Sequence, residues 1–75
     1  MNNELTLKER IQEYLYKWKV KDPNHWVNGG EVERLAQEIG FKASNASRRC
    51  RELVDEQILD RRENEKGYVE YQFKF

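Results

Sequence analysis

Apolar residues at helical spacing lie on both sides of Gly40, and this feature constrains the fold more than any other in the sequence. The stripe before the glycine is Val32, Leu35, Ala36 and Ile39, and the stripe after it is Ala46, Cys50, Leu53 and Val54. Each stripe recurs every three or four residues, which is the period of an amphipathic helix. Glycine often ends helices because it adopts the left-handed conformation without a steric penalty. The sequence therefore predicts two helices joined by a tight turn at Gly40, with Phe41 folding back onto the first.

Polar residues predict where these two helices begin. Asn28 is a candidate N-cap for the first of them, because its side-chain oxygen can accept a hydrogen bond from a free backbone amide. Glu31 then lies in the first turn, where a negative charge suits the helix dipole. Ser44 is the candidate N-cap for the second helix, which we expect to end near Gln57.

An earlier helix is predicted from about Leu7 to Lys19. Thr6 and Glu9 have the spacing of a capping box, in which each side chain bonds the other residue's backbone amide. The apolar stripe that follows is Leu7, Ile11, Tyr14, Leu15 and Trp18. Pro23 disfavours helix in the residue before it, so the helix ends close to that point.

The last part of the chain predicts a β-hairpin. Two short runs, Ile58–Arg62 and Tyr68–Phe75, are separated by a polar connector that ends in Gly67. The second run alternates Val69, Tyr71, Phe73 and Phe75 with Tyr68, Glu70, Gln72 and Lys74. Alternation of this kind indicates a half-buried strand. The pair Trp26-Val27 can lie along the edge of the hairpin as a short strand.

Length and composition narrow the class of protein. The 75 residues suffice for one domain, residues 1–75, with flexible ends at about residues 1–4. No apolar run has the length that spans a bilayer, which favours a cytoplasmic protein with no membrane partner. Cys50 is the only cysteine and His25 the only histidine, so an internal disulfide or a cysteine-built zinc site is excluded. We expect no enzyme activity, no metal and no cofactor, because no nucleophile–base pair or ligand set is visible.

The charges are unevenly distributed although they cancel. The chain has 14 basic and 14 acidic residues, and zero net charge argues against nucleic-acid binding. The bases Lys42, Arg48, Arg49 and Arg51 nevertheless lie in a stretch without an acid, and the acids Glu52, Asp55, Glu56 and Asp60 follow it. Screening limits the reach of charges to about 8–10 Å, so a local basic cluster can still attract DNA.

Taken together, these residues resemble the winged helix-turn-helix superfamily from about Leu7 to Phe75. The informative stretch runs from Leu35 to Leu53, where Leu-Ala precedes a glycine turn, a serine and a helix with apolar residues at the superfamily's spacing. An apolar pair, a polar wing and a closing strand with Tyr71 follow. The resemblance implies an α+β domain with three helices, a short strand between helices 1 and 2, and a C-terminal β-hairpin wing. Many members have glycine where this chain has Gln57.

The third helix supplies the candidate DNA-reading residues. Its expected outward face carries Ser44, Asn45, Ser47, Arg48 and Arg51. We assign Asn45, Arg48 and Ser47 to bases in the major groove, because asparagine and arginine match adenine and guanine edges. Arg51 and Lys42 are assigned to phosphates, as are the first backbone amides of the helix near Ser44.

Two parts of this interpretation stay open. The helix face could be merely solvated, with its arginines paired to the acids one turn later, and Arg49 lies nearest to such a pairing. The resemblance implies that the wing touches DNA, and Arg62 and Lys66 are its candidate residues, but Glu63 and Glu65 dilute their charge. An ordinary charged hairpin tip is the alternative.

We therefore expect sequence-specific binding of double-stranded DNA by a small transcriptional regulator or phage accessory factor. The alternative is a protein-interaction module in a larger assembly, since fold alone does not dictate function. A homodimer or a protein partner would use the first helix or the closing strand.

Overall fold

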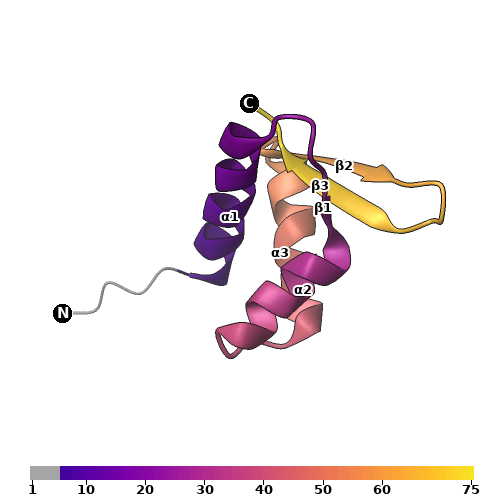
Figure 1. Ribbon diagram of the computed structural model, residues 1–75. Coiled ribbons are helices and arrows are strands. Elements are labelled where there is room, and N and C mark those ends of the chain that lie inside the picture. Colours follow the sequence, from indigo (N-terminus) through magenta and orange to yellow (C-terminus); the bar gives the residue numbers. More distant parts are fainter. Residues whose placement is uncertain (1–5) are drawn as a thin grey trace.

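The computed structural model describes residues 6–75, and it contains three helices and three strands in that range (Figure 1). The expected flexibility of residues 1–4 lies outside the described residues. The helices are α1 (Leu7–Lys21), α2 (Gly29–Glu38) and α3 (Ala43–Asp55), and the strands are β1 (Val27–Asn28), β2 (Leu59–Glu63) and β3 (Val69–Phe73). The protein is a small α+β domain in which all three helices lie beside one antiparallel sheet.

The sheet has the order β1-β3-β2, so the last strand of the chain is the central one. β2 and β3 form the predicted hairpin, with Arg61 opposite Tyr71. Val27 of β1 also pairs with Tyr71, which confirms that the segment after Trp26 lies along the edge of the hairpin. The hairpin projects beyond the helices, away from α1 (Figure 1).

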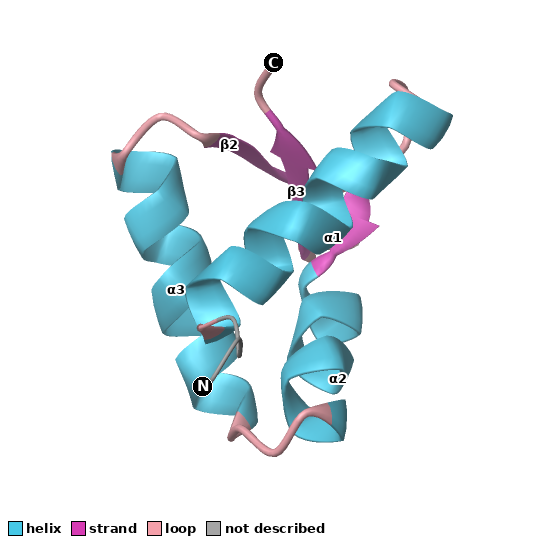
Figure 2. Ribbon diagram, turned by 90° about the vertical axis from the view of Figure 1, so that its left-hand side faces the viewer, coloured by secondary structure: helices cyan, strands magenta, loops and turns pink. Residues whose placement is uncertain are grey.

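The core lies where the three helices meet one face of the sheet. Its buried members are Leu7, Ile11, Leu15, Val27, Val32, Ala36, Ala46, Cys50, Leu53, Leu59 and Tyr71. The residues predicted for the inner stripe of each helix are therefore buried or packed against this cluster. Figure 2 shows α1 in front of the strands, with α3 and α2 on its two sides. Tyr14 of α1 also donates a hydrogen bond to the carboxylate of Glu31 on α2.

Two of the predicted helix starts are confirmed and one is wrong. Thr6 and Glu9 form the capping box, and the Asn28 side chain accepts from the amide of Gly30. Ser44 does not cap α3, which begins at Ala43 with Lys42 in the N-cap position and no side-chain cap. The connection between α2 and α3 is short, because the amide of Phe41 already bonds back to the oxygen of Ala36 and α3 begins at Ala43. Ser44 therefore lies within the first turn of α3.

Two helices differ from prediction at their C-terminal ends. α1 continues to Lys21, two residues beyond the predicted end, and its basic last turn complements the helix dipole. α3 ends at Asp55 rather than near Gln57. Gln57 has a φ of 64°, which is the left-handed conformation that breaks the helix.

The alternation predicted for β3 is correct for its inner face and wrong in two places. Val69, Tyr71 and Phe73 face the core, but Phe75 lies outside the strand and is 78% exposed. Gln72, expected on the polar face, is buried. Its side-chain amide donates to the backbone oxygens of Pro23 and His25, because the segment between α1 and β1 crosses that face of the strand.

Candidate nucleic-acid interface

One ridge of α3 is exposed along its whole length. Ser44, Arg48, Arg51 and Asp55 follow each other at helical spacing, and all four are exposed. The opposite side of the helix carries Ala46, Cys50 and Leu53, which are buried in the core. The amphipathic pattern that buries one face therefore turns the predicted base-reading residue Arg48 and the predicted phosphate contact Arg51 outward.

The flank of α3 that faces α1 contains a matched set of charges. Arg49 Nη1 lies 2.7 Å from a carboxylate oxygen of Glu52. Lys8 Nζ of α1 lies 2.5 Å from Glu56 and 3.8 Å from Glu52. Two of the acids that follow the basic stretch are thus engaged by Lys8 and Arg49. No ion pair involves Arg48 or Arg51 within residues 6–75.

These pairings shift the pKa values of the groups involved. The hydrogen bond from Arg49 lowers the pKa of Glu52 below its ordinary value, and the charges of Arg49, Lys8 and Arg48 add to this effect. The hydrogen bond to Glu56 raises the pKa of Lys8. Both groups therefore stay ionised over a wider pH range than they would in an unfolded chain.

Asn45 and Ser47 do not lie on the exposed ridge. Both are half-buried, and they lie on opposite flanks of α3. Ser47 Oγ donates to a carboxylate oxygen of Glu33 on α2 at 3.3 Å. Asn45 lines a hollow of about 550 Å³ on the α1 side, together with Lys8 and Phe41. Of the residues assigned to bases, only Arg48 projects fully from the helix.

Lys42 adds a further positive charge at the start of α3. It is exposed, and it has no ion pair among the pairs found in residues 6–75. Ser44 follows two residues later on the exposed ridge. The stretch from the N-cap to the third turn of α3 therefore presents Lys42, Ser44, Arg48 and Arg51 without an intervening exposed acid.

The two arginines of β2 lie on opposite faces of the sheet. Arg62, the predicted wing contact, donates to Glu70 at 2.8 Å, and its guanidinium lies 4.3 Å from the centre of the Trp26 ring. Arg61 is opposite Tyr71 in the strand register, and therefore shares the core-facing side of the sheet with α3. Arg61 belongs to the predicted wing, but only Arg62 and Lys66 are assigned there as DNA contacts from the sequence. The signal was available, because Leu59 is apolar and a strand returns to the same face every second residue.

Arg61 and Arg51 both act on the hydroxyl of Tyr71. Burial raises the pKa of Tyr71 above its ordinary value, and the positive charges of Arg61 and Arg51 partly oppose that shift. The two arginines come from different elements, β2 and α3. Arg61 is opposite Tyr71 in the strand register, so it lies on the side of the sheet that faces α3.

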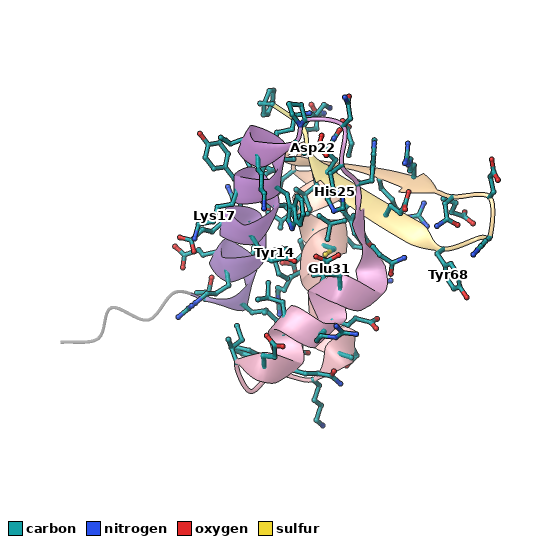
Figure 3. All side chains as sticks on the ribbon, in the orientation of Figure 1. Tyr14, Lys17, Asp22, His25, Glu31 and Tyr68 are labelled. Carbon is teal, nitrogen blue, oxygen red and sulfur yellow. The ribbon has the colours of Figure 1, made fainter. Side chains whose placement is uncertain are left out.

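The hairpin tip has a defined backbone. The Asn64 side chain accepts from the amides of Lys66 and Tyr68, and the Asn64 backbone amide donates to the oxygen of Tyr68. Gly67 has a φ of 84°, which the predicted glycine turn requires. Lys66 is exposed on this tip, and Tyr68 projects from the hairpin (Figure 3).

Cys50 and His25, the other side chains with reactive chemistry, are packed within the fold. Cys50 is buried, and this burial raises the pKa of its thiol to about 12. The ring of His25 stacks on Trp18 with 3.9 Å between centroids. Residues 6–75 contain no cluster of three or more acidic, histidine or cysteine side chains that could hold a metal ion.

Neither protein-family models, curated proteins nor solved structures give a match to this chain. Within the part that the structure describes, none of the helices combines the length and apolar character needed to cross a membrane. Support for a function therefore comes from the geometry of α3 and the hairpin.

Proposed function

We propose that this chain is a winged helix-turn-helix domain that binds double-stranded DNA, with α3 in the major groove, and that it acts as a small transcriptional regulator or phage accessory factor. The order of elements and the β2–β3 hairpin after α3 agree with the layout of that superfamily. The major groove of B-DNA admits an α-helix, and a recognition helix reaches base edges with its first turns.

One observation carries this proposal: Arg48 and Arg51 are exposed and have no acidic partner among residues 6–75, while Arg49 and Lys8 engage the neighbouring acids. A merely solvated, self-neutralised face would pair its arginines with the acids one turn later. Here only the flank toward α1 is neutralised. The ridge carries Arg48 and Arg51 against one acid, Asp55, with Lys42 at its start, although the net charge of the chain is zero.

Within this proposal Arg48 reads a base edge, because it lies at the centre of the exposed ridge and its guanidinium can bond guanine O6 and N7. Arg51, Lys42 and Ser44 hold phosphates. Arg61 joins them as the hairpin contact, while Lys66 remains a candidate at the tip. Arg62 has a lower priority because Glu70 and Trp26 already engage it. Asn45 and Ser47 also have a lower priority, because both are half-buried and Ser47 already bonds Glu33.

The test is a titration of the protein with a random-sequence duplex at about 50 and 200 mM salt. We expect weak binding that declines steeply with salt, because phosphate contacts release counterions. Amide shifts should concentrate between Lys42 and Arg51 and near Arg61. Absent shifts at low salt, or shifts confined to α1, would contradict DNA binding. Arg10→Ala is the matched control, since Arg10 is an exposed base on α1.

A protein-interaction module is the second candidate, and exposed apolar side chains on α1 favour it. Tyr16 and Val20 lie four residues apart on one helix face and are 51% and 66% exposed. This surface is separate from the α3 ridge, so the two functions can coexist in one molecule.

A further inference from the structure

Ser47 is bonded across two helices to a carboxylate that has no cationic partner. Ser47 Oγ of α3 donates to a carboxylate oxygen of Glu33 on α2, with 3.3 Å between the two atoms. Both residues are half-buried, and Glu33 takes part in no ion pair within residues 6–75. Burial and the charge of Glu33 raise the pKa of the Cys50 thiol, so the carboxylate also lies close to the inner side of α3. The acid is therefore held against α3 without being neutralised by a base.

Glu33 and Ser47 line a hollow beside the exposed ridge of α3. The hollow has a volume of about 400 Å³ between α2, α3 and β3, and Tyr71 also lines it. Ser47 follows Ser44 by three residues and precedes Arg51 by four, so it is a surface neighbour of both on the helix. Glu33 therefore brings a negative charge to the edge of the basic ridge.

The bond to Glu33 gives the serine hydroxyl a defined polarity. A free hydroxyl both donates and accepts hydrogen bonds, so by itself it does not distinguish one base from another. Here Ser47 donates its hydrogen to Glu33, and the pair offers only acceptor oxygens to a further partner. In the major groove cytosine presents an N4 amino donor, guanine and thymine present acceptors, and adenine carries an N7 acceptor beside its amino group. A pair that can only accept therefore matches cytosine best.

We propose that Glu33 and Ser47 together determine DNA specificity by accepting a hydrogen bond from the N4 amino group of a cytosine near the base that Arg48 contacts. This inference rests on the proposed binding of DNA by α3, and it adds a residue of α2 to the contact. Ser47 lies within the first two turns of α3, from which a recognition helix reaches base edges. The charge of Glu33 opposes phosphate contacts, so it also weakens binding to duplexes that lack the cytosine.

The experiment starts from the duplex that the parent protein selects from a randomised library. We expect the selected site to contain a cytosine next to the position at which Arg48→Ala loses selectivity. Replacing that cytosine by deoxyuridine exchanges the N4 donor for an O4 acceptor and does not add the methyl group of thymine. This exchange should weaken binding of the parent about tenfold, as measured by fluorescence anisotropy.

Substitutions of the two residues test whether they cause this preference. Glu33→Gln and Ser47→Ala should each reduce the difference between the cytosine and deoxyuridine duplexes to about twofold or less. Ser47→Thr keeps the hydroxyl and should retain the difference. Glu38→Gln is the matched control, because Glu38 is an exposed acid at the other end of α2, and it should also retain the difference. Thermal melts confirm that each variant is folded.

The possible outcomes separate this inference from the proposed function. If the parent binds DNA with a preference that depends on Arg48, but selects no cytosine beside it or binds both duplexes equally, the inference alone is overturned. A tenfold difference that persists in both Glu33→Gln and Ser47→Ala would also overturn it, and would show that the Ser47–Glu33 bond only links α3 to α2. A parent that binds no duplex at low salt would overturn the proposed function and this inference with it.

Discussion

The two sides of α3 carry similar residues and differ in what surrounds them. On the flank toward α1, Arg49 meets Glu52, and Lys8 bonds Glu56, so positive and negative charges are balanced within the fold. On the exposed ridge, Arg48 and Arg51 have no ion-pair partner in residues 6–75. The position of each arginine around the helix axis therefore sets which charge is available, because neighbours in sequence point in directions about 100° apart.

The largest expected effect comes from the buried side of α3, which holds the exposed ridge and the α1 flank in position. Leu53 is completely buried on this side, so Leu53→Ala should lower the free energy of unfolding by about 2–5 kcal/mol. A domain of this size has a small stability margin, and much of the variant should unfold. Urea denaturation measures the loss. A midpoint close to that of the parent would show that the helix is held in another orientation.

The second largest effect is a difference in DNA binding between variants of two adjacent arginines, Arg48 on the exposed ridge and Arg49 on the flank toward α1. Arg48→Ala should weaken binding to the preferred DNA site by about 1–3 kcal/mol and flatten selectivity at one or two base pairs. Arg49→Ala should leave DNA binding unchanged, because its guanidinium is already engaged by Glu52. Fluorescence anisotropy on the selected site and on a scrambled duplex measures both variants. Equal losses for Arg48→Ala on the two duplexes would exclude base reading.

A third test separates phosphate contact from base reading on the same ridge. Arg51→Ala should weaken binding to all sequences alike and reduce the slope of log K against log salt by about one. Arg61→Ala should behave in the same way if the hairpin extends the ridge. Arg62→Ala is the matched control on the other sheet face. A salt slope that changes for Arg62→Ala and stays constant for Arg61→Ala would reverse our assignment of the hairpin.

The ends of α2 and α3 offer a smaller test, which changes stability without touching either side of α3. Gly40 and Gln57 occupy equivalent positions, since the amides after them bond back to Ala36 and Leu53 in the same pattern. Both have positive φ, which costs glutamine about 1 kcal/mol relative to glycine. Gln57→Gly should therefore raise the free energy of unfolding by about 1 kcal/mol. Gly40→Ala should lower it, and both changes are measured by thermal melts.

The smallest effect concerns the charges of the neutralised flank. The pKa of Glu52 is lowered in the fold, so its stabilisation is present above its ordinary pKa of 4.5 and is lost as the pH falls through the lower, folded value. The pKa of Lys8 is raised, so its contribution is present below 10.5 and is lost at higher pH. Glu52→Gln should reduce the acid dependence of Tm below pH 4.5. An unchanged dependence would show that this pairing is absent in solution.

The sequence predicted the elements of this fold well because most of its local signals agree with the packing. The stripes around Leu53 and Ile11, the capping box at Thr6 and the glycine turn at Gly40 all appear as expected. These features depend on neighbours within a few residues, and backbone geometry enforces them. Gln57 is the informative exception, since a residue that disfavours positive φ adopts it where the chain must turn into β2.

For the candidate site, the sequence by itself placed Arg48 and Arg51 outward and identified Lys42 as a nearby base. Tertiary structure alone decided which charges remain available. Glu52 of α3 and the following Glu56 are engaged by Lys8, which belongs to the first helix of the chain, and Glu52 is also engaged by Arg49. Gln72 is buried because the segment carrying Pro23 and His25 crosses it. Periodicity reports only the face of one element, whereas a side chain's partners depend on which distant segment the fold brings against that face.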